Sequence, residues 1–220
     1  NDDEPLHDAV MRIFLDAAIH YLKIAAPSSQ EASDYLYRII EAEFEEWSGS
    51  ELFEIAQSML RDANGNRDYL MGKICMMKPD IPISAFDSGW SYLFNSTFCD
   101  NVKALMLKGK LFEEGYTREG IQQVVRNHSV AYYYYSNAAQ NGSCEAKLIC
   151  AQWCMEGKGC AANQVKAYYL FDDAARNTEV HEFDLELFSC SQSSWWRTAN
   201  LKLAEFYVSG AAFPPDYAVA

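Results

Sequence analysis

The chain has 220 residues, half of them apolar, and carries 31 acidic against 18 basic side chains for a formal net charge of -13. That length and apolar content suffice for the core of one large domain or a short repeat array, which excludes a disordered chain. The acidic excess repels phosphate backbones, so nucleic acid is not an expected partner. We expect the excess acidic side chains to form a solvated surface; the alternative is that they attract a basic peptide or protein.

No apolar run reaches the roughly 20 residues needed to cross a bilayer, and the opening residues are acidic, unlike the basic start of a signal peptide. We therefore expect no membrane insertion. The odd number of cysteines, seven, rules out complete pairing within the chain. Because unpaired thiols persist in reducing compartments, a cytoplasmic location is favoured, and a periplasmic or secreted one is the alternative if a signal peptide was removed.

Helices are predicted along the first hundred residues. The segment AAIHYLKIAA (17–26) has apolar residues at helical spacing, and the acidic run 41–46 is expected to form an exposed helix surface. Ser48 and Glu51 have the spacing of a capping box ahead of the next helix, which Asn64-Gly65 ends. Further helices are predicted over 68–77 and 85–98, separated by two prolines, and no alternating pattern long enough for a sheet is found.

A repeated unit is clearest from residue 146 to 175. Its first helix has one apolar stripe, formed by Ala146, Cys150, Ala151 and Cys154. Gly157 and Gly159 end this helix, because glycine accepts the left-handed conformation of a tight helix end, and Asn163 is a plausible N-cap for the second helix. The second helix has its own stripe, formed by Ala167, Leu170, Phe171, Ala174 and Ala175. The unit is a helix, a glycine turn and an antiparallel helix.

The same sequence pattern recurs 36 residues upstream, where Ala131 takes the place of Ala167, and again downstream from Ala199. Three first helices share one spacing, which pairs Ala104 with Gly115, Ala146 with Gly157 and Ala199 with Gly210. The unit starts are 42 and 53 residues apart, so two insertions are predicted, YTREGIQQVVRNHS and NTEVHEFDLELFSCSQSSWW. The second mixes acidic and aromatic residues; it either adjusts binding or folds Trp195 and Trp196 back onto the next helix.

With these residues the chain resembles the Sel-one-like repeat family, a relative of the tetratricopeptide repeats. The best unit matches the family pattern at Ala146, Gly157, Gly159, Lys166, Ala167, Phe171, Ala174 and Ala175. It departs at Cys150 and Ala151, which replace Leu-Gly, at Cys154, which replaces an aromatic, and at Cys160 after the turn. A match to a second helix is also seen at Ala18, Tyr21, Leu22, Ala25 and Ala26.

The resemblance implies an all-α fold, a right-handed α-solenoid of antiparallel helix pairs. We expect a single helical-repeat domain over 1–220, with divergent repeats over 1–100 and recognisable repeats over 101–220. The last of these stops near the start of its second helix at Ala220, so more repeats or another chain is expected to cover its apolar edge. Self-association through this repeat is one possibility.

The sequence offers no catalytic constellation. Nucleophile-elbow, phosphate-loop and His-Glu-x-x-His motifs are absent, and Gly157-Lys158-Gly159 lies at a helix end with no Lys-Ser or Lys-Thr after it. Cys150 and Cys154 share a helical face but have no histidine nearby at zinc-site spacing, which favours small core residues over metal ligands. No catalytic residue, metal or cofactor is therefore predicted.

Binding is expected in a groove lined by the first helix of each pair, which is where the resemblance points. The row predicted to contact a peptide or protein lies off the buried stripe and comprises Gln152, Trp153, Glu156, Lys110, Glu114 and Glu205. Trp153 is either an exposed anchor or packs against the neighbouring repeat. The predicted function is a non-enzymatic scaffold or adaptor; the alternatives are a regulatory or substrate-docking segment of a larger enzyme and a self-association module.

Overall fold

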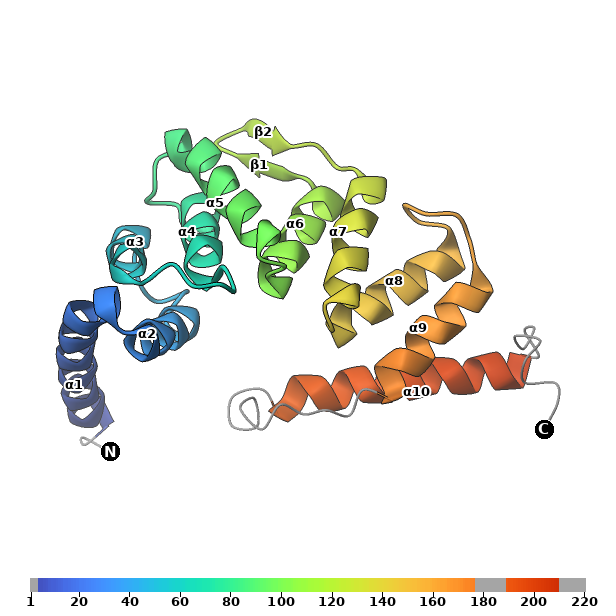
Figure 1. Ribbon diagram of the computed structural model, residues 1–220, viewed down its shortest axis with the longest axis horizontal. Helices are drawn as coiled ribbons and strands as arrows, with labels where there is room; N and C mark the ends of the chain where they lie inside the picture. Colours follow the sequence, from blue (N-terminus) through green and yellow to red (C-terminus); the bar gives the residue numbers. More distant parts are fainter. Residues whose placement is uncertain (1–3, 177–188, 210–220) are drawn as a thin grey trace. The chain divides into compact units, whose positions relative to one another are not determined.

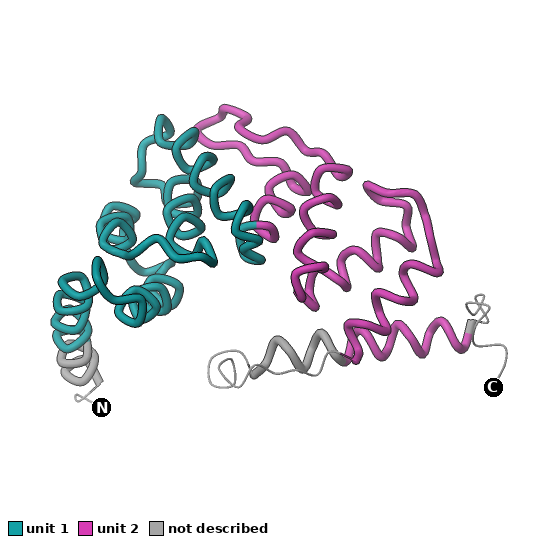
Figure 2. The backbone as a smooth tube through the Cα atoms, in the orientation of Figure 1, with its two compact units in different colours: residues 1–104 teal, residues 105–220 magenta. Residues whose placement is uncertain are grey.

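The computed structural model describes residues 4–176 and 189–209, and its elements are helices apart from one small hairpin (Figure 1). The predicted all-α repeat fold is confirmed. The chain forms two compact units, unit 1 over Asn1–Ala104 and unit 2 over Leu105–Ala220 (Figure 2). The border lies near the change from divergent to recognisable repeats expected at residue 100. The assignment of a single domain stays a prediction.

Unit 1 consists of helices joined by short turns. Its elements are α1 (Glu4–Ala25), α2 (Gln30–Ala42), α3 (Gly49–Ser58), α4 (Asn66–Met77) and α5 (Phe86–Phe98), with one-turn 3-10 helices at Ala26–Ser28 and Ile83–Ala85. The closest pair is α4 and α5, where two glycines allow the backbones to approach. A Cβ on Gly72 would lie 2.6 Å from Leu93, and one on Gly89 would lie 2.7 Å from the Cβ of Cys75.

The predicted capping box at the start of α3 is confirmed. The Glu51 amide donates to the Ser48 hydroxyl at 3.3 Å, and the Ser48 amide donates to the Glu51 carboxylate at 3.2 Å. Asp80 accepts two more amides of this helix end, from Gly49 at 2.9 Å and from Ser50 at 3.0 Å. The unpaired donors of the helix N-terminus are thus satisfied by side chains from two segments.

One expectation for unit 1 was wrong, and a second was met only in part. The acidic run does not form a helix surface, because α2 ends at Ala42 and the chain turns there; Glu41 lies half-buried between Lys73, at 3.1 Å, and Lys103, at 2.6 Å. The match of segment 17–26 to a repeat second helix is met in part: the segment is helical up to Ala25, Ala26 is fully buried, and Leu22 and Ala25 are half-buried. Ala18 and Tyr21 are exposed, whereas Ala167, the counterpart of Ala18, is fully buried.

Unit 2 contains the recognisable repeats. After α6 (Val102–Glu114), which begins at the end of unit 1, it comprises β1 (Tyr116–Arg118), β2 (Ile121–Val124), α7 (His128–Gln140), α8 (Cys144–Glu156), α9 (Gln164–Arg176) and α10 (Ser189–Ser209). The helices α7 and α9 begin and end at the same positions of the 36-residue period. The N-cap is also repeated. Asn127 accepts the amides of Ser129 and Val130 at 3.1 Å, and the predicted cap Asn163 accepts that of Lys166 at 2.9 Å.

The antiparallel hairpin of β1 and β2 was not predicted. It occupies the first of the two expected insertions, and its turn residues Glu119 and Gly120 have φ values of 53° and 77°. Positive φ at both central residues fits the twist of a two-residue hairpin. The strands have three and four residues, too short to produce a recognisable alternation.

Burial follows the repeat register. Ala104, Ala146 and Ala199, which open the three first helices, each have 0% exposure. In the second helices Tyr135 and Phe171 occupy one register and are 3% and 2% exposed. Gly115 and Gly157 have φ values of 74° and 73° at corresponding helix ends. The second insertion over 177–188, the side chains of Trp195 and Trp196, and the last unit from residue 210 lie outside the described residues.

Candidate functional site

The row of side chains predicted to bind a partner lies in unit 2. Lys110, Gln152 and Glu205 share one register on three first helices, and all are exposed. Glu114 and Glu156 share the register four residues later and are exposed as well. Five of the six predicted residues therefore present polar side chains to solvent at repeated positions of α6, α8 and α10. We call these five residues the first-helix row.

Trp153, the sixth, does not belong to that surface. It is 4% exposed, and its counterparts Leu111 and Phe206 are 6% and 8% exposed. The expectation of an exposed aromatic anchor was wrong, and the alternative of packing against the neighbouring repeat describes the residue. The residue that directly follows Lys110, Gln152 or Glu205 is therefore a core residue in each of the three units.

Trp153 is buried because aromatic rings of α7 enclose it. Its ring lies 5.5 Å from that of Tyr135 and 5.7 Å from that of His128, both edge-to-face, and stacks on Tyr132 at 6.4 Å. The Lys158 ammonium lies 4.2 Å from the centre of the indole, in the geometry of a cation–π contact. The indole thus joins α7, α8 and the glycine turn.

An ion pair covers the edge of this cluster. The Lys158 ammonium donates to one Glu113 oxygen at 2.7 Å, and the Tyr135 hydroxyl donates to the other at 2.8 Å. Burial alone would raise the pKa of Glu113, but these two hydrogen bonds, together with the attraction of the Lys158 and His128 charges, outweigh it, so the pKa is lowered. The carboxylate therefore stays ionised and ties α6 to α7 and to the turn after α8.

Gly159 fixes the position of that turn. Its φ is 69°, and a Cβ there would lie 2.2 Å from the His128 carbonyl oxygen. We expect Gly159→Ala to lower the free energy of unfolding by about 2 kcal/mol or more, because it adds left-handed strain to a backbone clash. Urea unfolding followed by circular dichroism measures the change. Gly142→Ala is the control, since its φ is 94° but nothing lies within 4 Å of the added Cβ. Equal losses in the two variants would contradict the role of the close contact.

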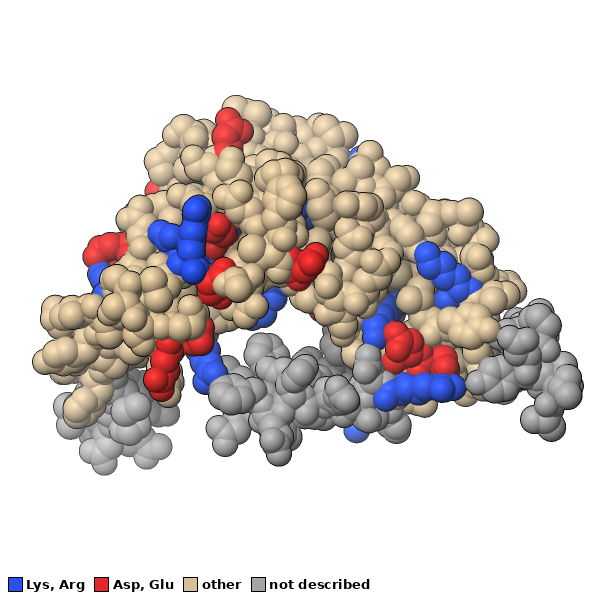
Figure 3. All heavy atoms as spheres, in the orientation of Figure 1, with Lys and Arg blue, Asp and Glu red and all other residues tan. Residues whose placement is uncertain are grey.

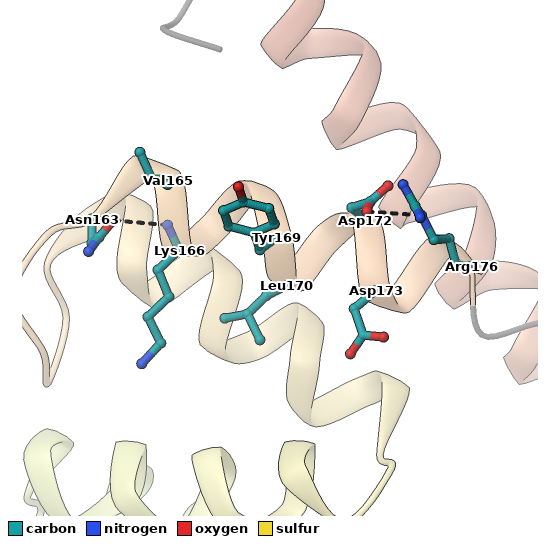
Figure 4. A pocket seen from close by; sticks show the side chains of 8 residues that line it. All are labelled: Asn163, Val165, Lys166, Tyr169, Leu170, Asp172, Asp173 and Arg176. Atoms are coloured by element: carbon teal, nitrogen blue, oxygen red, sulfur yellow. Dashed lines mark hydrogen bonds and ion pairs between the residues drawn. The ribbon is translucent and has the colours of Figure 1, made fainter. Parts of the chain in front are cut away.

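A shallow hollow of about 670 Å³ lies along the outer face of α9 (Figure 4). Its lining comes from this helix and its N-cap: Asn163, Val165, Lys166, Tyr169, Leu170, Asp172, Asp173 and Arg176. Val165 and Tyr169 are 43% and 46% exposed, and Tyr133, one period earlier on α7, is 60% exposed. This second-helix face was not predicted. The signal available was the helical spacing of Val165, Tyr169, Asp172 and Arg176, opposite the recognised stripe.

Three ion pairs of described residues lie on or beside α9 and α10. Arg176 and Asp172 lie 2.9 Å apart, Lys147 and Asp173 2.8 Å apart, and Lys202 and Glu205 2.9 Å apart. On the face drawn in Figure 3, acidic and basic atoms accordingly lie side by side over these helices. In contrast, no described basic side chain forms an ion pair with Glu114 or Glu156.

Two carboxylates with lowered pKa values lie in contacts between elements. Glu41, held by Lys73 and Lys103, is one, and Glu113 is the other. Over residues 12–176 and 197–208, whose side chains are described, no three histidine, cysteine or acidic side chains are grouped so that they could hold a metal ion. In the same ranges, no helix combines the length and apolar character required to span a membrane.

A solved structure supports the fold. No protein-family model and no curated protein matches the chain. The crystal structure of a Sel1 repeat protein from Oxalobacter formigenes matches 82% of the chain with a TM-score of 0.53 at 18% sequence identity. The match covers 48% of that protein, so the chain corresponds to about half its length. The resemblance found in the sequence is thus matched in three dimensions, and the chain has the helical-repeat fold of a Sel1 repeat protein.

Proposed function

We propose that the chain is a non-enzymatic scaffold that binds a basic segment of another protein along the first-helix row. The observation that carries this proposal is the register of the row. Lys110, Gln152 and Glu205 are exposed on three successive first helices, directly before a buried position in each. A rigid, repeated backbone that displays different polar side chains at equivalent points suits the recognition of an extended partner.

Charge indicates the kind of partner. Within the first-helix row, Glu114 and Glu156 form no ion pair with a described basic side chain and lie one repeat apart, and the whole chain carries a net charge of -13. Lysine or arginine side chains of a partner would pair with them, and the acidic field would speed the encounter. With Trp153 buried, the row has no aromatic anchor, so binding should depend strongly on salt.

A catalytic role has less support. The shifted titratable groups Glu41 and Glu113 each have both carboxylate oxygens occupied by lysine or tyrosine partners. In the α9 hollow, Asp172 pairs with Arg176 and Asp173 pairs with Lys147, while the Lys166 ammonium lies 5.3 Å from the centre of the Tyr132 ring. Such networks shift pKa values for structural reasons, without bringing a nucleophile and a base together.

The test compares charge reversals on two faces. Glu114, Glu156 and Glu205 are changed to lysine together, and Asp34, Glu45 and Glu46, exposed residues of unit 1, are changed likewise as a control with the same net charge. Partners captured from a lysate are identified and purified, and their affinity is measured by titration calorimetry at low and high salt. We expect the first variant to lose at least tenfold in affinity and the control to lose less than threefold, on the scale of roughly 1.4 kcal/mol per tenfold change.

Two results would contradict partner binding along the first-helix row. Equal losses in both variants would show general charge attraction. Unchanged binding in both, with a loss in a Tyr133→Ala/Tyr169→Ala variant, would place the interface on the second helices. If neither the wild-type chain nor the variants retain a partner, scaffolding by this segment is contradicted.

Other functions of the fold stay as alternatives with separate tests. Because the chain corresponds to about half of the matched Sel1 repeat protein, it is also compatible with a regulatory or docking segment of a larger enzyme. Self-association through the last repeat, whose residues from 210 onward lie outside the described part, would make the mass in solution depend on concentration. A cytoplasmic location stays a proposal.

A further inference from the structure

Two cysteines of unit 2 lie next to each other where α8 meets the glycine turn. The sulfur of Cys154, in the last turn of α8, is 3.8 Å from that of Cys160, in the loop that follows. Cys154 is 1% exposed, and Cys160 is half-buried. The Tyr132 hydroxyl lies 3.2 Å from the Cys154 sulfur and caps the pair. Both thiols are free in the structure.

We infer that Cys154 and Cys160 are a redox-sensitive dithiol that closes to an intrachain disulfide by exchange with a low-molecular-weight disulfide such as oxidised glutathione. A disulfide needs its sulfurs about 2.05 Å apart, so they must approach by roughly 1.7 Å. Cys160 belongs to no helix or strand, so we expect the loop that carries it to supply this movement. This site is independent of the proposed partner binding.

The exposure of the two thiols sets the order of the steps. The Cys160 thiol, once deprotonated, attacks one sulfur of the small disulfide and displaces the other as a thiolate. The Cys154 thiol then loses its proton and attacks the Cys160 sulfur, which breaks the mixed disulfide and releases the second thiolate. The protein loses two electrons and two protons, and the small disulfide is reduced to two thiols.

The other described cysteines are less suited to this reaction. Cys150 lies one turn before Cys154 on the same helix, where the backbone holds the two side chains apart, and it is 1% exposed. Cys75 and Cys99 belong to unit 1. Cys144 opens α8, at the opposite end of that helix from Cys154. Among the described cysteines, Cys154 and Cys160 are the pair whose sulfurs are in contact.

Closing the bond would lock the connection from α8 to α9. A hydrogen bond already links the two ends of that connection, because the Asn163 amide donates to the Cys154 carbonyl at 2.7 Å. Asn163 caps α9 and lines its hollow. A covalent link between residues 154 and 160 therefore removes freedom from the loop that sets the start of α9.

The first experiment maps the bond. The native chain is equilibrated in glutathione buffers of increasing oxidised fraction, quenched with acid, alkylated and digested for mass spectrometry. We expect a linked peptide joining Cys154 and Cys160, lighter by two hydrogens than the dithiol, to appear before any other crosslink. Cys160→Ser should abolish it, and Cys144→Ser should leave it unchanged. A link that instead joins Cys150 or a second chain, or glutathione that remains attached to Cys160, would overturn the inference.

A second measurement tests the lock itself. Amide hydrogen exchange over residues 157–163 is compared between the oxidised and reduced chain. We expect at least a fivefold slowing on oxidation in the wild-type chain and none in Cys160→Ser. Unchanged exchange in a chain shown to carry the bond would overturn the conformational effect, because the loop would then be no more ordered than before.

Discussion

Trp153→Ala is expected to lower the free energy of unfolding by roughly 3–5 kcal/mol, the range for removing a large aromatic side chain from a core. The indole is 4% exposed and contacts three aromatic rings of α7 and the Lys158 ammonium, so its loss opens a cavity at the junction of α7, α8 and the glycine turn. The measurement is urea unfolding followed by far-ultraviolet circular dichroism, which does not depend on the deleted tryptophan.

Two further variants serve as comparisons for this result. Gln152→Ala changes an exposed residue of the same helix turn, and we expect a change within about 0.5 kcal/mol. Trp153→Phe keeps an aromatic ring and should cost less than the alanine variant. An alanine variant as stable as the wild-type chain would contradict the burial of Trp153 and return it to the binding surface.

Lys108→Met is expected to stabilise the chain by up to about 3 kcal/mol at neutral pH. Lys108 is 1% exposed, its ammonium lies 5.3 Å from the Tyr134 ring centre, and it occupies the register of the buried Cys150. Burial lowers the pKa of Lys108 to about 8 from its ordinary value of 10.5. Folding therefore places a cation where the other two first helices have the uncharged side chains of Cys150 and Leu203.

The same residue should make stability depend on pH. The unfolded chain keeps the Lys108 proton up to about pH 10.5, whereas the folded chain loses it near pH 8, so unfolding takes up a proton between these values. Stability attributable to this residue thus rises with pH through that window and is lowest below it. The measurement is the difference in unfolding free energy between Lys108→Met and wild type from pH 6 to 10, which should shrink as pH rises. A constant difference would contradict the lowered pKa.

The sequence predicted the repeat register because small residues recur at fixed spacing. Ala104, Ala146 and Ala199 are buried as that spacing requires, and Asn163 caps its helix as expected. Trp153 was misplaced because α8 packs on both sides, against α7 and α9. Its buried residues therefore surround much of the helix, and a single apolar stripe assigns the second face to solvent.

Two other features gave weaker signals. The hairpin strands have three and four residues, so only the Glu119-Gly120 turn could have indicated them. The contact between Cys154 and Cys160 depends on how the loop after α8 folds back, which helical periodicity does not describe. Exposure of Tyr133 and Tyr169 repeats with the period, but the buried positions of the same helices dominate the pattern.

The hairpin also bears on how the chain can be lengthened. It leaves α6 after Gly115 and returns at Asn127, whose amide donates to the Phe112 carbonyl at 2.7 Å and closes the base of the excursion. The helix that follows keeps the same bounds within the period as α9, which has no such excursion before it. The tip at Glu119-Gly120, where a Cβ on the glycine would meet nothing within 4 Å, is therefore a graft point. A peptide tag or a small folded domain inserted there should leave the neighbouring helices in register.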